Sequence, residues 1–230
     1  MPPLVTKMDR HALLTALTTR CHTLGFDLVQ PFALDWYNDA VALEHRLPDL
    51  GRRRALGALI AHTRAVWEPF CAAWRDDAAL RAETDPLDRY TERCLADVLA
   101  SLPLGAEIRF AHQPAPRRPA IQRLADVSGL APLSLVGLNI HPLYGAWVGL
   151  RAALVFDLDA PDGPPPIVAN PCRDCARTCV PVFERARLAS GPDAWRAWLA
   201  VRDACPIGRA HRYSEAQIVY HYTKDRGFLG

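Results

Sequence analysis

The run Pro-Asp-Gly-Pro-Pro-Pro at residues 161–166 divides the chain more sharply than any other sequence feature. Proline has no backbone donor and fixes its own φ angle, so neither a helix nor an inner strand can continue through this run. About 160 residues precede it, which is enough for one globular domain with its own core. We therefore expect a main domain over residues 1–160 and a smaller cysteine-rich segment, packed on it, over residues 167–230.

Helix-like periodicity occurs twice before the proline run. Apolar side chains recur every three or four positions over residues 9–24, and Gly25 follows as a stop signal. Thr84-Asp85-Pro86 is typical of a helix start, and the helix that it opens is predicted to reach about residue 102.

Short apolar runs alternate with these helices and predict strands at residues 26–34, 55–62 and 107–112. Pro31 interrupts the first run, which suits the edge of a sheet. Two further runs, 133–140 and 146–159, flank the turn HPLYG and predict a β-hairpin. Mixed helices and strands with a late hairpin indicate an α+β fold in three layers rather than a doubly wound parallel sheet.

The charge pattern and the hydropathy exclude several classes of function. The net charge is +2 and the two signs are interspersed, so the one-sided basic stripe of a nucleic-acid-binding protein is not expected. No apolar stretch approaches the ~20 residues that span a bilayer, so no membrane association is expected. The start, MPPLVTKMDR, lacks the apolar core of a signal peptide, and we expect a cytoplasmic protein with reduced thiols.

The seven cysteines are distributed in two ways. Three are isolated on predicted helices, where we expect buried and inert thiols: Cys21, Cys71 and Cys94. The other four follow the proline run, three in the spacing C-x2-C-x3-C and one in a later Cys-Pro pair: Cys172, Cys175, Cys179 and Cys205.

Clustered thiolates in a reducing compartment usually bind a metal. Zinc sites normally have two separated C-x2-C pairs, whereas three close cysteines with a remote Cys-Pro are similar to half of a bacterial ferredoxin. A 4Fe–4S cluster is therefore the favoured prediction, although the second spacing departs from the ferredoxin pattern, and structural zinc or no metal remain alternatives. The nearby Arg173, Arg177 and Arg185 could offset the negative charge of such a cluster.

Four segments together resemble the CblC family of intracellular cobalamin-processing proteins. In chain order they are GFDLVQPFALDWYND (25–39), TDPLDRYTERCLADVLASLP (84–103), NIHPLYGAWVGLRAALV (139–155) and RYSEAQ (212–217). The resemblance implies a flavin-nitroreductase-like α/β/α sandwich with a large pocket for cobalamin. The family's HP-x2-GG-W segment, which lines that pocket, matches five residues here: His141, Pro142, Gly145, Ala146 and Trp147.

The same resemblance implies that Trp36, Tyr37 and Asn38 lie near this pocket, with core packing as the alternative. Family members that dealkylate cobalamin hold glutathione with arginines, and Arg212 is the arginine that the RYSE motif carries over, with a surface ion pair as the alternative. The animal proteins of the family lack the full set of four clustered cysteines. The spacing of the four cysteines in this chain is similar to that in epoxyqueuosine reductases and reductive dehalogenases, which join a related cobalamin fold to ferredoxin-like clusters.

These observations predict a cobalamin-binding iron–sulfur oxidoreductase. It is expected to reduce or remove the upper ligand of cobalamin by decyanation or dealkylation, or to use reduced cobalamin on another substrate. Two alternatives remain: a non-catalytic cobalamin carrier with structural zinc, and a flavin-dependent nitroreductase-like enzyme, for which the sequence contains no convincing phosphate-binding motif. Glutathione or a redox partner is the expected partner, and a homodimer is expected by analogy with the nitroreductase fold.

Overall fold

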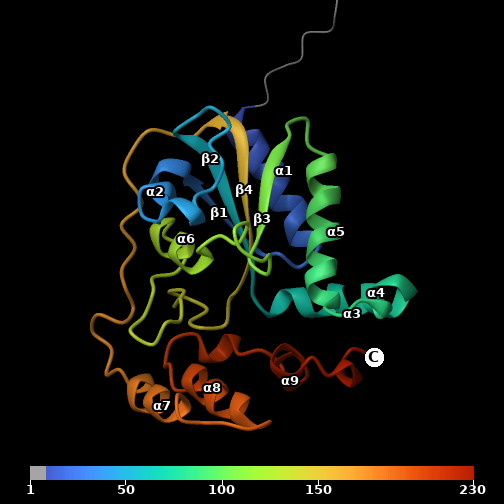
Figure 1. The fold of residues 1–230 in the computed structure, drawn as a ribbon, viewed down its shortest axis with the longest axis vertical. Coiled ribbons are helices and arrows are strands. Elements are labelled where there is room, and N and C mark those ends of the chain that lie inside the picture. Colours follow the sequence, from blue (N-terminus) through green and yellow to red (C-terminus); the bar gives the residue numbers. More distant parts are fainter. Residues whose placement is uncertain (1–8) are drawn as a thin grey trace, which may run out of the picture.

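The computed structural model describes residues 9–230, so most of the chain start that we compared with a signal peptide lies outside the described residues. An antiparallel sheet of four strands, in the order β1-β2-β4-β3, forms the middle of the molecule (Figure 1). Its strands are β1 (Leu28–Ala33), β2 (Ala55–His62), β3 (Ala106–Phe110) and β4 (Gly149–Asp159). The predicted strands at 26–34, 55–62 and 107–112 are confirmed, and β1, which contains Pro31, lies at an edge of the sheet.

Helices cover both faces of this sheet. On one face lie α1 (Arg10–Thr23) and α5 (Pro86–Ala100), and on the other lie α2 (Leu34–Asn38) and α6 (Ile121–Val127) (Figure 1). Successive residues of β2 alternate between the two layers: Leu56 and Ile60 pack with the α1/α5 layer, while Leu59 packs with the α2/α6 layer. The predicted three-layer sandwich is confirmed.

Shorter elements complete the described chain. They are α3 (Trp67–Asp76), α4 (Ala78–Ala82), α7 (Cys179–Ala186), α8 (Ala194–Asp203), α9 (Glu215–Thr223), and the 3-10 turns η1 (Leu43–His45), η2 (Arg64–Val66), η3 (Arg209–His211) and η4 (Arg226–Phe228). None of the helices over residues 9–230 combines the length and the apolar character needed to cross a bilayer.

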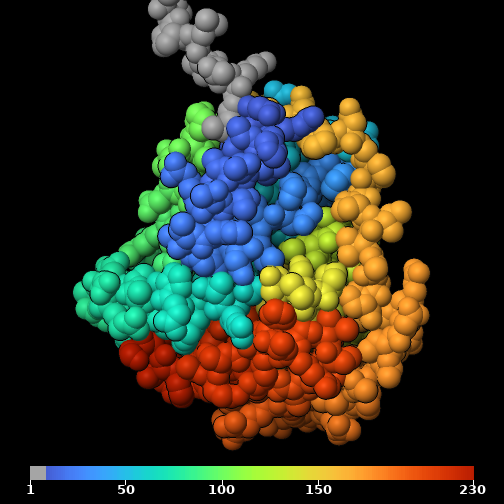
Figure 2. Space-filling model, turned by 180° about the vertical axis from the view of Figure 1, so that it is seen from behind, coloured from blue at the N-terminus to red at the C-terminus, as the bar shows by residue number. Residues whose placement is uncertain are grey.

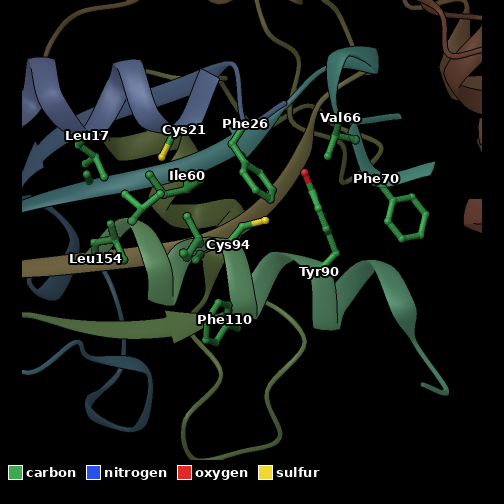
Figure 3. Close-up of a cluster of buried hydrophobic side chains, with 14 of the residues drawn as sticks. Leu17, Cys21, Phe26, Ile60, Val66, Phe70, Tyr90, Cys94, Phe110 and Leu154 are labelled. Atoms are coloured by element: carbon green, nitrogen blue, oxygen red, sulfur yellow. The ribbon is translucent and has the colours of Figure 1, made fainter. Parts of the chain in front are cut away.

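The three isolated cysteines are buried, as expected. Cys21 of α1 and Cys94 of α5 lie in the apolar cluster between these helices and the sheet (Figure 3), and Cys71 of α3 belongs to the same cluster. Burial raises the pKa of Cys21 to about 12 and the pKa of Cys71 and Cys94 to about 11. The reactive thiolate form is therefore suppressed at these positions.

The predicted hairpin around the HPLYG turn is wrong. Strand β4 is present, but residues 133–140 form no strand; they contribute one isolated bridge, between Leu133 and Asn139. Both edges of β4 are already paired, one with β2 and the other with β3, so no edge is left for a hairpin partner. The run at 133–140 instead forms a loop, in which Val136 and Ile140 are buried against the C-terminal segment.

The C-terminal segment lies across one end of the molecule. In Figure 2 it forms a continuous layer below the rest of the chain. Tyr220 of α9 and Leu229 are fully buried and belong to the same core cluster as Phe70 and Tyr90. The segment is thus packed on the main domain, while the division at residues 160 and 167 stays a prediction.

Candidate functional site

The turn at residues 141–145 is closed by its own backbone. The N–H of His141 donates to the carbonyl of Gly145 (2.9 Å), and the N–H of Gly145 donates to the carbonyl of His141 (2.8 Å). The ring nitrogen Nδ1 of His141 accepts from the N–H groups of Leu143 (3.1 Å) and Tyr144 (3.2 Å). Burial lowers the pKa of His141. The neutral ring therefore carries its proton on Nε2, which is available as a donor.

This turn is pressed against the loop that follows Cys205. Gly145 has φ of +59°, and a Cβ atom there would lie 1.9 Å from the carbonyl oxygen of Ile207. Gly208 has φ of +74°, and a Cβ atom there would lie 2.2 Å from the carbonyl carbon of Tyr144. Only glycine combines this backbone conformation with such a close approach. The two segments are therefore in direct backbone contact, although 60 or so residues separate them in sequence.

Trp147, the last residue of the matched motif, is only 1% exposed. Its ring packs against Tyr213 with centroids 5.5 Å apart, and the guanidinium groups of Arg202 and Arg212 lie 5.8 and 5.6 Å from its centre. Arg212 is itself held by Asp203 (2.8 Å) and by Glu215. Its expected role toward glutathione therefore stays a prediction, and the ion-pair alternative is present in the structure.

The structure brings the four clustered cysteines together around one pocket. Cys172 and Cys175 lie in the loop before α7, Cys179 begins α7, and Cys205 follows α8. Apolar side chains complete most of the wall, and none of the described residues that line it is acidic or a histidine. All four thiols are free of disulfides. The backbone N–H of Arg177 donates to Sγ of Cys175 (3.4 Å).

The pocket can be compared with the two metal groups that the sequence left open. Over residues 9–230, no three cysteine, histidine or carboxylate side chains converge on a point where a single ion could bind, so the tetrahedral arrangement of structural zinc is not preformed. A 4Fe–4S cube is held differently, because each thiolate bonds a different iron atom and the sulfurs stand farther apart. Four thiols around an apolar pocket fit either group in ligand type and number. Burial raises the pKa of Cys172, Cys179 and Cys205, so protons must leave when a metal binds.

The cysteine pocket lies directly beside the turn at residues 141–147, called the HPLYGAW turn below. Ile140, the residue before the turn, lines the pocket. Ile140, Ala146 and Cys205 are buried together in one small apolar cluster, which Cys172 and Ile207 also contact. Two motifs that the sequence presents separately thus form one structural unit.

A second pocket, of about 260 Å³, opens beside Trp147 at the start of β4. It is lined by residues from strands β2 and β4, helix α8 and the C-terminal segment: His62, Val148, Gly149, Leu150, Arg151, Arg202, Tyr213, His221 and Tyr222. Its polar groups are mostly donors, and the hydroxyl of Tyr213 has no hydrogen-bond partner among the described residues. We refer to it below as the arginine pocket.

The arginine pocket contains a buried network that the sequence did not reveal. The Nε of Arg151 donates to Nε2 of His62 (2.9 Å), and an Nη of Arg151 donates to Asp88 of α5 (3.1 Å). The other nitrogen of His62, Nδ1, donates to the carbonyl of Thr63 (2.7 Å), which fixes the neutral tautomer. Burial, with Arg151 second, lowers the pKa of His62 well below its ordinary value. The network therefore places the Arg151 cation between a neutral imidazole and the Asp88 carboxylate.

Trp36, Tyr37 and Asn38 lie at the other end of the sheet. They form α2, beside the end of β2 that pairs with Asp159, whereas the HPLYGAW turn leads into the opposite end of β4, ~33 Å away along the strand. The hydroxyl of Tyr37 donates to the carbonyl of His45 (2.8 Å), and Asn38 bonds both backbone groups of Leu47. The structure does not bring these residues to the turn, and the hydrogen bonds of Tyr37 and Asn38 match the packing alternative. Their expected place beside cobalamin stays a prediction.

Comparison with known proteins identifies the family. Residues 25–227 match the model of the methylmalonic aciduria and homocystinuria type C family. This chain belongs to that family. It is 32% identical to the human "cyanocobalamin reductase / alkylcobalamin dealkylase" in an alignment that covers 86% of this chain and 73% of the human protein, and 27% identical to the Danio rerio protein of the same name.

Solved structures confirm the family's fold. The B12-trafficking protein CblC of C. elegans superimposes with a TM-score of 0.69 at 19% identity, covering 95% of this chain and 94% of that chain. An epoxyqueuosine reductase solved with a tRNA-Tyr stem loop superimposes with a TM-score of 0.53 at 12% identity, covering 89% of this chain and 67% of that chain. The nitroreductase-like sandwich that the resemblance implied is therefore confirmed.

Proposed function

We propose that this chain binds cobalamin and reduces its cobalt or removes its upper ligand, with a 4Fe–4S cluster on Cys172, Cys175, Cys179 and Cys205 as the resident redox group. The names of the human and zebrafish relatives support the substrate. The observation that carries the proposal is the wall shared by the cysteine pocket and the HPLYGAW turn, which Ile140 forms. A redox group in the pocket would lie directly behind the turn that the family resemblance assigns to cobalamin.

The chemistry of the substrate explains why a redox group is useful there. Reduction of a corrin cobalt weakens its bond to the upper ligand, because the added electron occupies an antibonding orbital along that bond. A thiolate-bound iron–sulfur cluster supplies single electrons when it is present. The residues of this chain contribute the surroundings. Ile140, Val180 and Ile207 give the cysteine pocket an apolar wall, and His141 offers the Nε2 proton to an amide of the corrin.

The arginine pocket supports a second activity, transfer of an upper alkyl group to a thiol such as glutathione. In that reaction the thiolate attacks the alkyl carbon, a carbon–sulfur bond forms, and the electron pair of the broken cobalt–carbon bond remains on cobalt. Arg202 lines the pocket, forms no ion pair with another residue from 9 to 230, and is suited to a carboxylate of the tripeptide. Arg151 is already paired with Asp88, and Arg212 with Asp203 and Glu215, so Arg202 is the better candidate for holding the thiol.

Anaerobic purification with iron, sulfide and zinc analysis tests the resident group. We expect a brown protein with broad absorbance near ~400 nm. Cys205→Ser should lose the iron and keep cobalamin binding, whereas Cys71→Ala, a change in the core, should keep both. Zinc without iron would favour the carrier alternative, and a yellow protein with bound flavin would favour the nitroreductase alternative.

Anaerobic titration with hydroxocobalamin and cyanocobalamin tests the substrate. Binding should shift the cobalamin spectrum toward the form without its lower base, and reductant should then produce the reduced-cobalt spectrum. An unchanged spectrum at micromolar protein would overturn the assignment.

A further inference from the structure

The surface over the cysteine pocket has an apolar centre and a cationic rim. Leu135 is 69% exposed and Leu133 is 38% exposed, and both line a shallow hollow with Arg173 and Arg177. This hollow is continuous with the cysteine pocket, because Leu135, Cys172 and Arg177 line both. The pattern of exposed leucine surrounded by charge is typical of a surface that another protein covers transiently.

The charge around this hollow is uncompensated. Arg173 and Arg177, which line the hollow, form no ion pair with any residue from 9 to 230. The other arginines nearby differ: Arg187 is paired with Glu184, and Arg212 is paired with Asp203 and Glu215. In the loop of residues 167–178, Asp174 is the single acidic residue. The face is therefore complementary to an acidic surface.

The cysteine cluster reaches solvent at this hollow through Cys172, which lines it. Cys175 and Cys179 are also partly exposed, whereas Cys205 is buried on the side of the HPLYGAW turn. A donor that docks on the hollow would contact Cys172 itself, and electron transfer slows steeply with distance. The opposite side of the pocket is occupied by the chain itself, through Ile140 and Ala146.

We propose that the hollow formed by Leu133, Leu135, Arg173 and Arg177 is the docking site of an acidic one-electron carrier protein, of the flavodoxin or ferredoxin class. This inference rests on the proposed function, because the carrier would deliver electrons to the group that the four cysteines would hold. An encounter would move one electron from the carrier to that group, and no covalent bond would form or break. A polynucleotide fits the face less well, because its centre is aliphatic and no exposed aromatic ring lines the hollow for stacking.

The experiment measures binding of a flavodoxin to the anaerobically purified protein at about 0.05 and 0.3 M salt. Arg173→Glu should weaken binding at low salt by about tenfold, mainly through a slower association rate, and Arg173→Glu with Arg177→Glu should abolish the salt dependence. Arg20→Glu makes the same charge change on the exposed surface of α1, far from the hollow, and should leave binding unchanged. Iron content and cobalamin binding are measured for every variant.

The outcomes separate this inference from the proposed function. Weakening of flavodoxin binding by Arg173→Glu but not by Arg20→Glu supports the docking site, even if the protein contains no iron. Three results would each overturn the docking site, even if iron is present. They are equal effects of the two variants, equal binding of the basic carrier cytochrome c, and displacement of flavodoxin by a short RNA hairpin. If the double variant loses iron, Arg173→Glu alone decides the result.

Discussion

A Cβ atom on Gly145 would lie 1.9 Å from the carbonyl oxygen of Ile207, so these two residues hold the HPLYGAW turn and the loop after Cys205 in backbone contact. No side chain can be inserted there without moving one segment away from the other. The contact thus fixes the position of the turn relative to the cysteine pocket.

Replacement of Gly145 by alanine tests this contact. We expect Gly145→Ala to lower the free energy of unfolding by about 2–4 kcal/mol and to weaken cobalamin binding, because the turn must move. Gly137→Ala is the control: Gly137 also has a positive φ (+74°), but nothing lies within 4 Å of its Cβ position, so it should cost only about 1 kcal/mol. Denaturant unfolding and cobalamin titration measure both effects. Equal losses in the two variants would show that the backbone angle, and not the contact, matters.

The buried histidines of the arginine pocket predict a dependence of stability on pH. Burial lowers the pKa of His62 and His221 well below the ordinary value, which is about 6.5 in the unfolded chain. Between those values the unfolded chain binds protons that the folded chain does not, so the free energy of unfolding should fall as the pH drops below about 6.5. His62→Gln keeps an acceptor for Arg151 and should make this decrease shallower. The exposed His22→Gln on α1 should leave the slope unchanged; if both variants behave alike, His62 is not responsible.

The seven thiols should differ in reactivity in the native protein without iron. We expect iodoacetamide to modify Cys172, Cys175 and Cys179 first, because they are partly exposed. Cys205 should react slowly, and the three core cysteines only after unfolding. Mass spectrometry of digests taken over time gives the order. Early modification of a core cysteine would contradict the packing between α1, α5 and the sheet.

Removal of a positive charge from the arginine pocket should affect dealkylation and leave the reductive reaction unchanged. Arg202→Gln should raise the KM for glutathione in dealkylation by about 10- to 100-fold, the loss expected for one charged hydrogen bond. Reductive removal of cyanide should change little. Arg196→Gln is the matched control, since Arg196 lies on the same helix but is exposed and stacks on Trp195. An unchanged KM in Arg202→Gln would remove this pocket from the thiol reaction.

The layers of the fold were predictable because local patterns and tertiary packing agree there. The periodicity of residues 9–24 and the Thr84-Asp85-Pro86 start correspond to α1 and α5, and the apolar run at 55–62 is a fully buried strand. The hairpin prediction failed because strand composition says nothing about which strand edges are free. Residues 133–140 have a suitable composition, but β2 and β3 already occupy both edges of β4.

The site was predictable only in part. Spacing identified the four cysteines, which do line one pocket, and the motif resemblance identified the turn beside it. His62, Arg151 and Arg202 were missed, because they come from three segments without any common spacing. One signal was available: His62 ends an apolar run and Arg151 interrupts another, and a polar side chain inside a buried strand needs a partner. Sequence alone does not say that each is the partner of the other.

None of the four clustered cysteines contributes to either apolar core beside the sheet. Cys179 packs against one small cluster between residues 136–146 and the C-terminal segment, and Cys172 and Cys205 belong to the other. We expect the three layers to stay folded when all four are replaced. The interior of the sandwich therefore places no demand on the four cysteine positions, and their identity can change without any rearrangement of the sheet or of the helices that cover it.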